Sequence, residues 1–421
     1  MTSVTTTSEL SQPAAEPSSH LFADWFDPIE TGVRERVRTF IEGMIRSELD
    51  AVLSRPRYAR RAKDPHGEPG AGVAGHRNGS RPRSLLGTFG KVTIEVPRAR
   101  LQVGDGSTTE WKSEVLRTYQ RRTRAADVLI ASSYLAGVNT RRVCHALAAL
   151  FGGAVRKDTV SRVWRQVQSD WEAWNARSLA DEPIVRLILD GTVVRVRLDR
   201  KATPISLLVV MGIRADGQKV LLAIRSMGSE STEAWRMVLD DLIGRGLQPP
   251  ELVIVDGGMG LERAIATVWD GVLVQRCTVH KHRNLLAHAP ERLHEEITAD
   301  YNDMIYATTP AEIETRRTAF IRKWRLKHHA VADSLEEAGE RLFTFTRFPR
   351  SQWRALRTTN VIERLHEEFR RRIKTQTVLP SADTAAMLFW ALLAGGQIRM
   401  RRVEGWRTLG VQPAQPIDLA A

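Results

Sequence analysis

Residues 185–214 decide the fold, and they read VRLILDGTVVRVRLDRKATPISLLVVMGIR. Val, Ile and Leu fill three short runs here, which predicts the strands VRLILD, TVVRVRL and SLLVVMGIR, the last two joined by a polar DRKATP turn. A further strand is predicted in KVLLAIRSMG, residues 219–228. The stretch therefore indicates successive antiparallel strands.

The next segments alternate between helix and strand patterns. Residues 233–247 (EAWRMVLDDLIGRGL) place apolar side chains at helical spacing, and ELVIVD at 251–256 is a short apolar strand. A glycine-marked helix is predicted at 257–269, and VLVQRC at 272–277 is one more strand. The sequence predicts an α/β fold, and this order of elements resembles the ribonuclease H-like fold.

Two aspartates fall at informative places in that order. In the ribonuclease H-like fold one acidic residue lies on the first strand and a second lies at the end of the fourth. Asp190 and Asp256 occupy those two places in the predicted order. The resemblance therefore concerns chemistry as well as topology.

A third acid, Glu363, lies far downstream in TTNVIERLHEEFRRRIKTQT. Hard divalent cations such as Mg²⁺ or Mn²⁺ prefer carboxylate oxygens, and two such ions can drive an in-line displacement at a phosphodiester. We therefore expect Asp190, Asp256 and Glu363 to bind two ions. Taken singly, each is better explained as an ordinary strand-end or helix-surface carboxylate.

The assignment of the third acid has two rivals on the same predicted helix. Glu367 and Glu368 lie one turn further along and could also face inward. The apolar residues Ile362, Leu365 and Phe369 mark the face that should pack.

Composition points to a polyanionic partner. The chain has 421 residues, 42% of them hydrophobic, and a net charge of +13. Because clustered Lys and Arg side chains release counterions from phosphate backbones, we expect nucleic acid as the partner. The two cysteines, Cys144 and Cys277, exclude a disulfide framework, and no apolar stretch is long enough for a membrane span. We expect a soluble, cytoplasmic protein that associates with the nucleoid.

The N-terminal region has a different organisation. Residues 1–19 are predicted to be a disordered tail, and 20–110 a helix, a flexible basic linker at 55–84 and a small β-element in GKVTIEVPRAR, ended by Pro97. Residues 111–180 have helical patterns.

Part of this helical region reads as a helix-turn-helix. Gly152 and Gly153 supply the turn, and Asp158 is expected to cap the second helix. Lys157, Arg162 and Arg165 then lie near the start of that helix, where DNA is usually met. A plain helical hairpin with a solvated basic face is the alternative.

Several motifs occur together in this chain. RCTVHKHRNLL spaces Cys277 and His280 as C-x-x-H, and TTNVIE places Asn360 three residues before Glu363. With YQRRTR, TRRVCHAL, the DG after the first acid and W-x-x-VLDDLIGRGL, the chain closely resembles the Mutator-like family of bacterial insertion-sequence transposases, from about residue 78 to 402.

This resemblance implies a DDE transposase with Asp190, Asp256 and Glu363 as its acids. It implies metal-dependent cleavage at transposon ends and transfer of the freed 3′-OH into target DNA, by a dimer or larger assembly on terminal inverted repeats. It also implies a core at 181–290 and 351–402, with a helical insertion at 291–350 and a tail at 403–421.

Other residues take supporting roles in this interpretation. Arg370, Arg371, Arg372 and Lys374 are expected to grip DNA. Cys277, His280 and Asn360 are expected to support the active site, since a zinc site normally needs four ligands. A ribonuclease H-like nuclease without strand transfer, and a non-catalytic DNA-binding derivative, remain alternatives.

Overall fold

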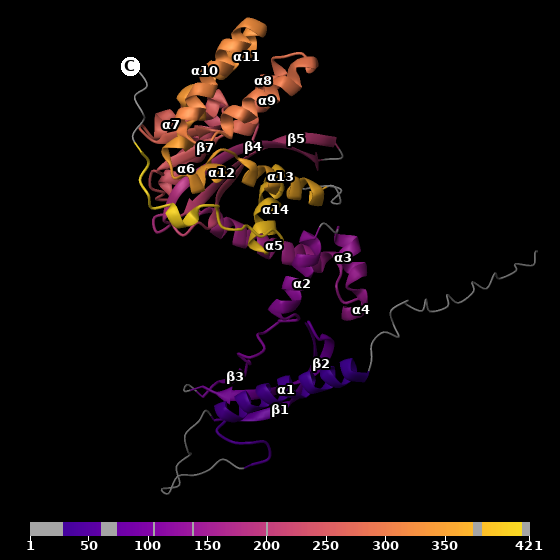
Figure 1. Ribbon diagram of the computed structural model, residues 1–421. Coiled ribbons are helices and arrows are strands. Elements are labelled where there is room, and N and C mark those ends of the chain that lie inside the picture. Colours follow the sequence, from indigo (N-terminus) through magenta and orange to yellow (C-terminus); the bar gives the residue numbers. More distant parts are fainter. Residues whose placement is uncertain are drawn as a thin grey trace, which may run out of the picture. The chain divides into compact units, whose positions relative to one another are not determined.

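The computed structural model consists of two compact units, each described here by itself (Figure 1). It describes residues 28–59, 74–103, 106–136, 139–198, 201–373 and 381–414. The first unit comprises residues 1–134 and 140–163, and the second comprises 135–139 and 164–421. The predicted disordered tail at 1–19 and the predicted DNA contact Lys374 lie outside the described residues.

A long helix lies on a small sheet in the first unit. Helix α1 (Pro28–Val52) contacts β2 (Gly90–Gln102), the middle strand of an antiparallel sheet with β1 (Gly75–Gly87) and β3 (Thr108–Glu110). Ile45 and Leu49 of α1 are fully buried in one cluster with Ile94 of the sheet. The predicted helix and β-element are both present.

Two details of this sheet differ from the prediction. Residues 75–84 belong to β1 and not to a linker, and β2 continues through Pro97 to Gln102. The register shifts between Arg77 and Ser80, where Gly79 adopts a φ of +73° and Ser80 pairs with Pro97. Since β1 bulges at this point, the ladder tolerates a residue without an N–H group.

The remaining helices near the N-terminus are α2 (Arg124–Leu135), α3 (Thr140–Ala146), α4 (Ala148–Phe151) and α5 (Lys157–Asn175). Gly152 and Gly153 both have positive φ between α4 and α5, as a tight turn requires. Helix α5 begins at Lys157, so the prediction that Asp158 caps it was wrong. Asp158 lies in the first turn, where its charge favours the helix dipole.

The second unit is built on a five-stranded sheet in the order β6-β5-β4-β7-β8. Strands β4 (Ile184–Leu198), β5 (Lys201–Arg214) and β6 (Lys219–Met227) pair antiparallel. Strands β7 (Leu252–Val255) and β8 (Leu273–Arg276) continue the sheet in parallel with β4. The α/β class is confirmed.

Strand β4 is one long strand where the sequence predicted two. Asp190 pairs with Val209 and Gly191 with Leu208 without interrupting the ladder. Backbone pairing does not depend on side-chain polarity, so a charged residue followed by glycine does not break the strand.

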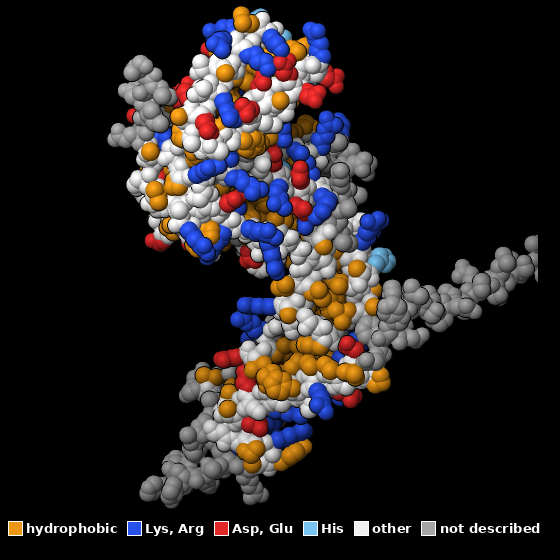
Figure 2. Space-filling view, in the orientation of Figure 1, with side chains coloured by type: hydrophobic (Ala, Val, Ile, Leu, Met, Phe, Trp, Pro, Cys, Tyr) orange, Lys and Arg blue, Asp and Glu red, His pale blue; other side chains and the backbone are white. Residues whose placement is uncertain are grey.

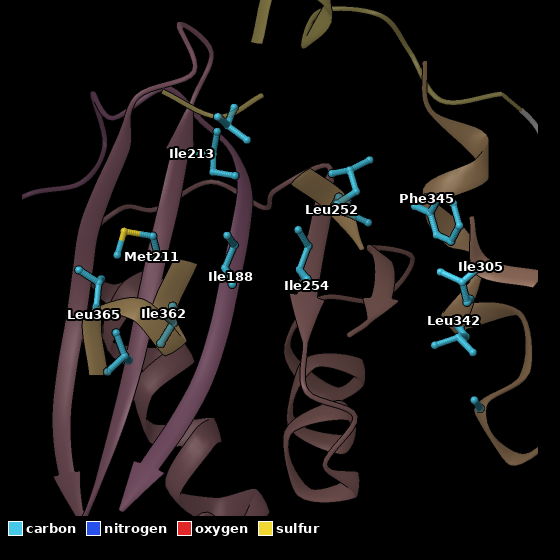
Figure 3. Close-up of a cluster of buried hydrophobic side chains, with 14 of the residues drawn as sticks. Ile188, Met211, Ile213, Leu252, Ile254, Ile305, Leu342, Phe345, Ile362 and Leu365 are labelled. Atoms are coloured by element: carbon cyan, nitrogen blue, oxygen red, sulfur yellow. The ribbon is translucent and has the colours of Figure 1, made fainter. Parts of the chain in front are cut away.

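The sheet is covered on both faces. Leu187 and Leu189 of β4 are buried with α6 (Thr232–Gly244) and α7 (Met259–Val268). Ile188, pointing the other way, is buried with α13 (Asn360–Ile373) and α14 (Ala382–Ala394). Figure 3 shows Ile362 and Leu365 of α13 beside Ile188 and Met211 of the sheet. Alternation along β4 therefore directs Asp190 to the α13 side.

Residues 278–356 are mostly helical. Helices α8 to α11 lie side by side (Figure 1), and their shared core joins the α13 side of the sheet. Val403 and Leu409 are also buried there, so this part of the predicted C-terminal tail belongs to the core. The bounds are α8 (Thr278–Ala287), η2 (Glu291–Leu293), α9 (His294–Ile305), α10 (Pro310–Lys327), α11 (His329–Ala338), η3 (Gly339–Leu342), η4 (Thr344–Arg347), η5 (Arg350–Gln352), α12 (Trp353–Leu356) and η6 (Trp406–Thr408).

None of the helices in the described ranges combines the length and the apolar character that a bilayer crossing requires.

Candidate active site

Two aspartates hold equivalent positions on neighbouring parallel strands. Ile188 of β4 pairs with Ile254 of β7, so Asp190 and Asp256 each follow two residues later. Asp190 is only 4% exposed, and the half-buried Asp256 comes directly after β7. Parallel strands in register thus direct both carboxylates to the same end of the sheet.

A tight turn fixes the Asp256 carboxylate. Its Oδ1 accepts a hydrogen bond of 2.9 Å from the backbone N–H of Gly258, and Gly257 between them has a φ of +97°. Only glycine adopts this conformation without strain. The turn then leads into α7, which begins at Met259.

Helix α13 supplies the third acid. Ile362, Leu365 and Phe369 are buried against the sheet side of the core, which confirms the predicted packed face. Glu363, beside this face, accepts hydrogen bonds from Arg283 at 2.9 Å and lies 3.3 Å from the His280 Nε2.

A pocket of about 240 Å³ joins these groups. Asp190, His280, Arg283 and Glu363 line this pocket, which we call the carboxylate pocket. Asp256 is not among its lining residues but interacts electrostatically with Asp190. The other residues that line it are Gly191, Thr192, His366, Glu367 and Arg370.

Around Asp190 the nearby acids outnumber the nearby cations. Burial, followed by the charges of Asp256, Glu363 and Glu230, raises the pKa of Asp190 to about 7 against the opposing charge of His280. The pKa of Glu230 is also raised, by burial and then by Asp256. Like charges in a low-dielectric site favour either a proton or a bound cation.

The chain matches the family described as "Transposase, Mutator family" over residues 18–398. It belongs to the Mutator family of transposases. Among curated relatives, the transposase for insertion sequence element ISRM5 of Rhizobium meliloti is 31% identical, covering 86% of each chain. The transposase for IS406 of Burkholderia multivorans is 30% identical over 76% of this chain and 81% of its own. The transposase for IS256 in transposon Tn4001 of Staphylococcus aureus is 30% identical over 75% and 80%.

In this Mutator-family transposase the C-x-x-H residues, Cys277 and His280, connect the start of α8 with the start of α13. Cys277 is fully buried at the N-cap position of α8, and its sulfur accepts the N–H of Thr359, which precedes α13, at 3.4 Å. The hydrogen bond with Cys277 is the main cause that raises the pKa of His280 to about 9. Burial opposes ionisation of the Cys277 thiol, yet the hydrogen bonds from His280 and Thr359 leave its pKa lowered. The pair thus holds a positive imidazole beside Glu363.

The other predicted residues of the second unit differ in whether they line the carboxylate pocket. Asn360 begins α13 but lines a different pocket, and Glu368 pairs with Arg371 and Arg372 instead of lining the carboxylate pocket. Arg370 does reach the carboxylate pocket, where it donates to the Thr192 hydroxyl at 2.9 Å. The predicted DNA contacts Lys157, Arg162 and Arg165 are all exposed on α5.

Sequence reasoning missed two residues at or beside this transposase's carboxylate pocket. The Glu230 carboxylate lies so close to Gly191, which lines the pocket, that a Cβ at 191 would collide with it. His366 is buried, its Nε2 has no hydrogen-bond partner in the part of the chain described, and burial followed by the charge of Arg370 lowers its pKa to about 3. Gly191, directly after Asp190, was the one feature of the sequence that could have indicated Glu230, because a residue without a side chain leaves room for that carboxylate.

Within the described ranges, no group of three or more His, Cys, Asp or Glu side chains is already arranged as a metal site. The charges of the carboxylates act on one another, but the Glu363 carboxylate itself contacts Arg283 and His280.

Proposed function

We propose that this chain is a DDE transposase of an insertion sequence, which cleaves DNA at the element's ends and transfers the freed 3′-OH into target DNA. The observation that carries the proposal is the buried Asp190 beside Asp256 and Glu363: burial, then the charges of Asp256 and Glu363, raise the pKa of Asp190 to about 7 against the charge of His280. A buried carboxylate with a perturbed pKa beside other acids is typical of functional sites. The named relatives are all transposases of insertion sequence elements.

The proposal includes a ribonuclease H-like core formed by residues 181–290 and 351–402, with 291–350 as a helical insertion. The strand order β6-β5-β4-β7-β8 supports it, since the first three strands pair antiparallel and the last two in parallel. Asp190 on the central strand and Asp256 after its parallel neighbour are where such a core carries acids.

Asp190, Asp256 and Glu363 would hold the divalent cations, Mg²⁺ or Mn²⁺, of the reaction. The residues fit because all are carboxylates and because burial and the neighbouring acids disfavour the charged form of Asp190, which a bound cation would stabilise. Two bound ions would activate the attacking oxygen and stabilise the leaving oxygen of the phosphodiester.

The chain's own residues prepare the site in three ways. The Gly257 turn fixes Asp256, and the packed face of α13 fixes the direction of Glu363. Arg283 and His280 hold the Glu363 carboxylate, so they restrain it until it turns to a cation. Arg370 and Arg283 place positive charge where a phosphate would enter.

DNA binding rests on further cations in this proposal. Lys157, Arg162 and Arg165 on α5 contact double-stranded DNA from the helical region 111–180, and Arg370, Arg371 and Arg372 contact the strand near the acids. Because two element ends must be joined to one target, the active form is a dimer or a larger assembly.

The test is a cleavage and strand-transfer assay on DNA that carries the ends flanking this gene. Asp190→Asn, Asp256→Asn and Glu363→Gln should each lower product formation roughly 10³-fold or more while DNA binding persists. Asp303→Asn, in an exposed carboxylate paired with Arg316, is the matched control. Normal activity of any site variant would refute its assignment, and cleavage without joining would refute strand transfer.

A further inference from the structure

A second and larger pocket lies on the other side of α13. Its volume is about 730 Å³, within the range of pockets that hold a nucleotide-sized ligand. Asn360, Val361 and Arg364 of α13 line it, whereas Glu363 and His366 of the same helix line the carboxylate pocket. One helix therefore separates an acidic pocket from a second one, which we call the basic pocket.

Cations dominate the lining of the basic pocket. Lys219, Arg354, Arg357, Arg364 and Arg402 line it together with the single acid Glu404. The acid is at 3.5 Å from Arg354, and both side chains are mostly exposed, so this ion pair contributes little. Arg402 is 3.9 Å from Asp216, an equally weak contact.

Two of these cations, Lys219 and Arg364, line the same pocket and act on each other by charge. Burial lowers the pKa of Lys219, and the charge of Arg364 lowers it further. Arg364 itself is exposed, and Lys219 is held in place because its ammonium donates to the Arg401 carbonyl at 2.9 Å. Like charges gathered in a concave site are stabilised when an anion binds between them.

An aromatic ring completes the basic pocket. Tyr306 at the end of α9 is 66% exposed, and the Arg357 guanidinium lies 4.8 Å from its ring centre. Arg357 is fixed, since it donates to the Ile305 carbonyl at 2.7 Å and also lies over the Phe345 ring. A rigid, exposed aromatic beside cations is how proteins bind single-stranded nucleic acid: the ring stacks on a base and the cations take the phosphate.

We propose that the basic pocket binds one nucleotide of a single DNA strand, with its phosphate between Lys219 and Arg364 and its base on Tyr306. The inference rests on the proposed function, because the strand is the one that continues past α13 from the scissile phosphate. The base must be unstacked from its duplex, since one exposed ring in a pocket cannot reach a base that remains paired. Figure 2 shows many Lys and Arg side chains on the exposed face of this unit, along which such a strand would run.

The test uses the full chain in EDTA, so that cleavage plays no part. The probe is a fluorescent 12-nucleotide oligothymidine, with anisotropy measured over a range of salt concentrations. Tyr306→Ala should weaken binding about 5- to 20-fold, and Tyr306→Phe should retain it. Arg364→Ala should weaken binding and lower the salt slope by about 0.7, the value for one phosphate contact on a single strand.

Two controls distinguish binding in this pocket from nonspecific attraction of the oligonucleotide to exposed basic side chains. Arg263→Ala removes an exposed charge from α7, on the opposite face of the sheet, and should leave the salt slope unchanged. Photo-crosslinking with 5-iodouracil in the oligonucleotide should label the peptide that contains Tyr306. Labels that lie only elsewhere, with unchanged affinity in both pocket variants, would refute the proposal.

Three further outcomes distinguish a base contact from phosphate binding alone, and the pocket from the proposed function. An oligonucleotide with abasic sites that binds as tightly as the intact probe would refute the base contact, since the pocket would then hold phosphate alone. Crosslinking at Tyr306 in a protein that neither cleaves nor joins DNA would refute the proposed function and support the pocket. Cleavage and joining of DNA without crosslinking at Tyr306 would refute the pocket and support the proposed function.

Discussion

Two clusters of buried charge in the second unit are built in opposite ways. Around Arg276 every acid is paired with a cation, and we call this a matched cluster: Arg276 pairs with Glu262 and Glu337, Arg341 with Glu262, and Lys281 with Glu337. Around Asp190 the acids Asp256, Glu363 and Glu230 act against the single cation His280, and burial together with these charges raises the pKa of Asp190 to about 7. A matched cluster is complete without a ligand, whereas an unmatched one is completed by something that binds.

The largest expected effect concerns the matched cluster. Arg276→Met should lower the free energy of unfolding by about 3 kcal/mol, because Glu262, only 6% exposed, loses its buried partner. Urea unfolding followed by tryptophan fluorescence measures the change. Arg341→Met removes the more exposed partner of the same carboxylate and should cost about 1 kcal/mol or less. Equal losses in both variants would mean that burial does not distinguish the two arginines.

A smaller effect with the opposite sign is expected in the unmatched cluster. The pKa of Asp190 is about 7 in the folded chain and about 3.9 when unfolded, so its contribution to stability is full below pH 4 and is lost as the pH rises to 7. In EDTA, Asp190→Asn should therefore gain about 2 kcal/mol of stability relative to the wild type between pH 5 and pH 7.

Chemical unfolding at pH 5 and pH 7 tests this expectation, with Asp303→Asn as the variant whose stability difference should stay constant. A constant difference for Asp190→Asn as well would mean that Asp190 ionises normally and that the cluster is matched after all.

The smallest effect is the response to metal. At a Mg²⁺ concentration ten times the dissociation constant, the wild type should gain about 1.4 kcal/mol over its stability in EDTA. Thermal unfolding with and without Mg²⁺ measures this gain. Arg276→Met should keep the gain despite its lower stability, and Asp190→Asn should lose it. A gain of equal size in Asp190→Asn would show that the cation binds elsewhere.

Local patterns predicted much of the fold. The alternation and apolar runs of 219–228 and 251–256 became strands, and the spacing of Ile362, Leu365 and Phe369 gave the packed face of α13, because these signals are carried by neighbours in the sequence. The family resemblance was confirmed by the match over residues 18–398.

Features that depend on distant pairing were not predictable. The continuity of β4 through Asp190 is decided by its ladder with β5, and the passage of β2 through Pro97 by the bulge opposite. Glu230 lies beside the carboxylate pocket because the segment after β6 packs against Gly191, a contact that periodicity does not encode. The roles assigned to Asp190, Asp256 and Glu363 stay predictions.

One hydrogen bond between residues far apart in the sequence bears on the order in which this site forms. The N–H of Thr278, at the start of α8, donates to the carbonyl of Arg357, just before α13, at 2.8 Å, and these residues are 79 positions apart. Closing a loop of that length costs about 4 kcal/mol of chain entropy, which the packing of the intervening helices must offset. During synthesis the two aspartates can therefore take their places on the sheet well before Glu363 arrives. Under the proposed function, a partly folded or truncated chain would hold an incomplete set of acids, and the competence to cut DNA would be tied to completion of the fold.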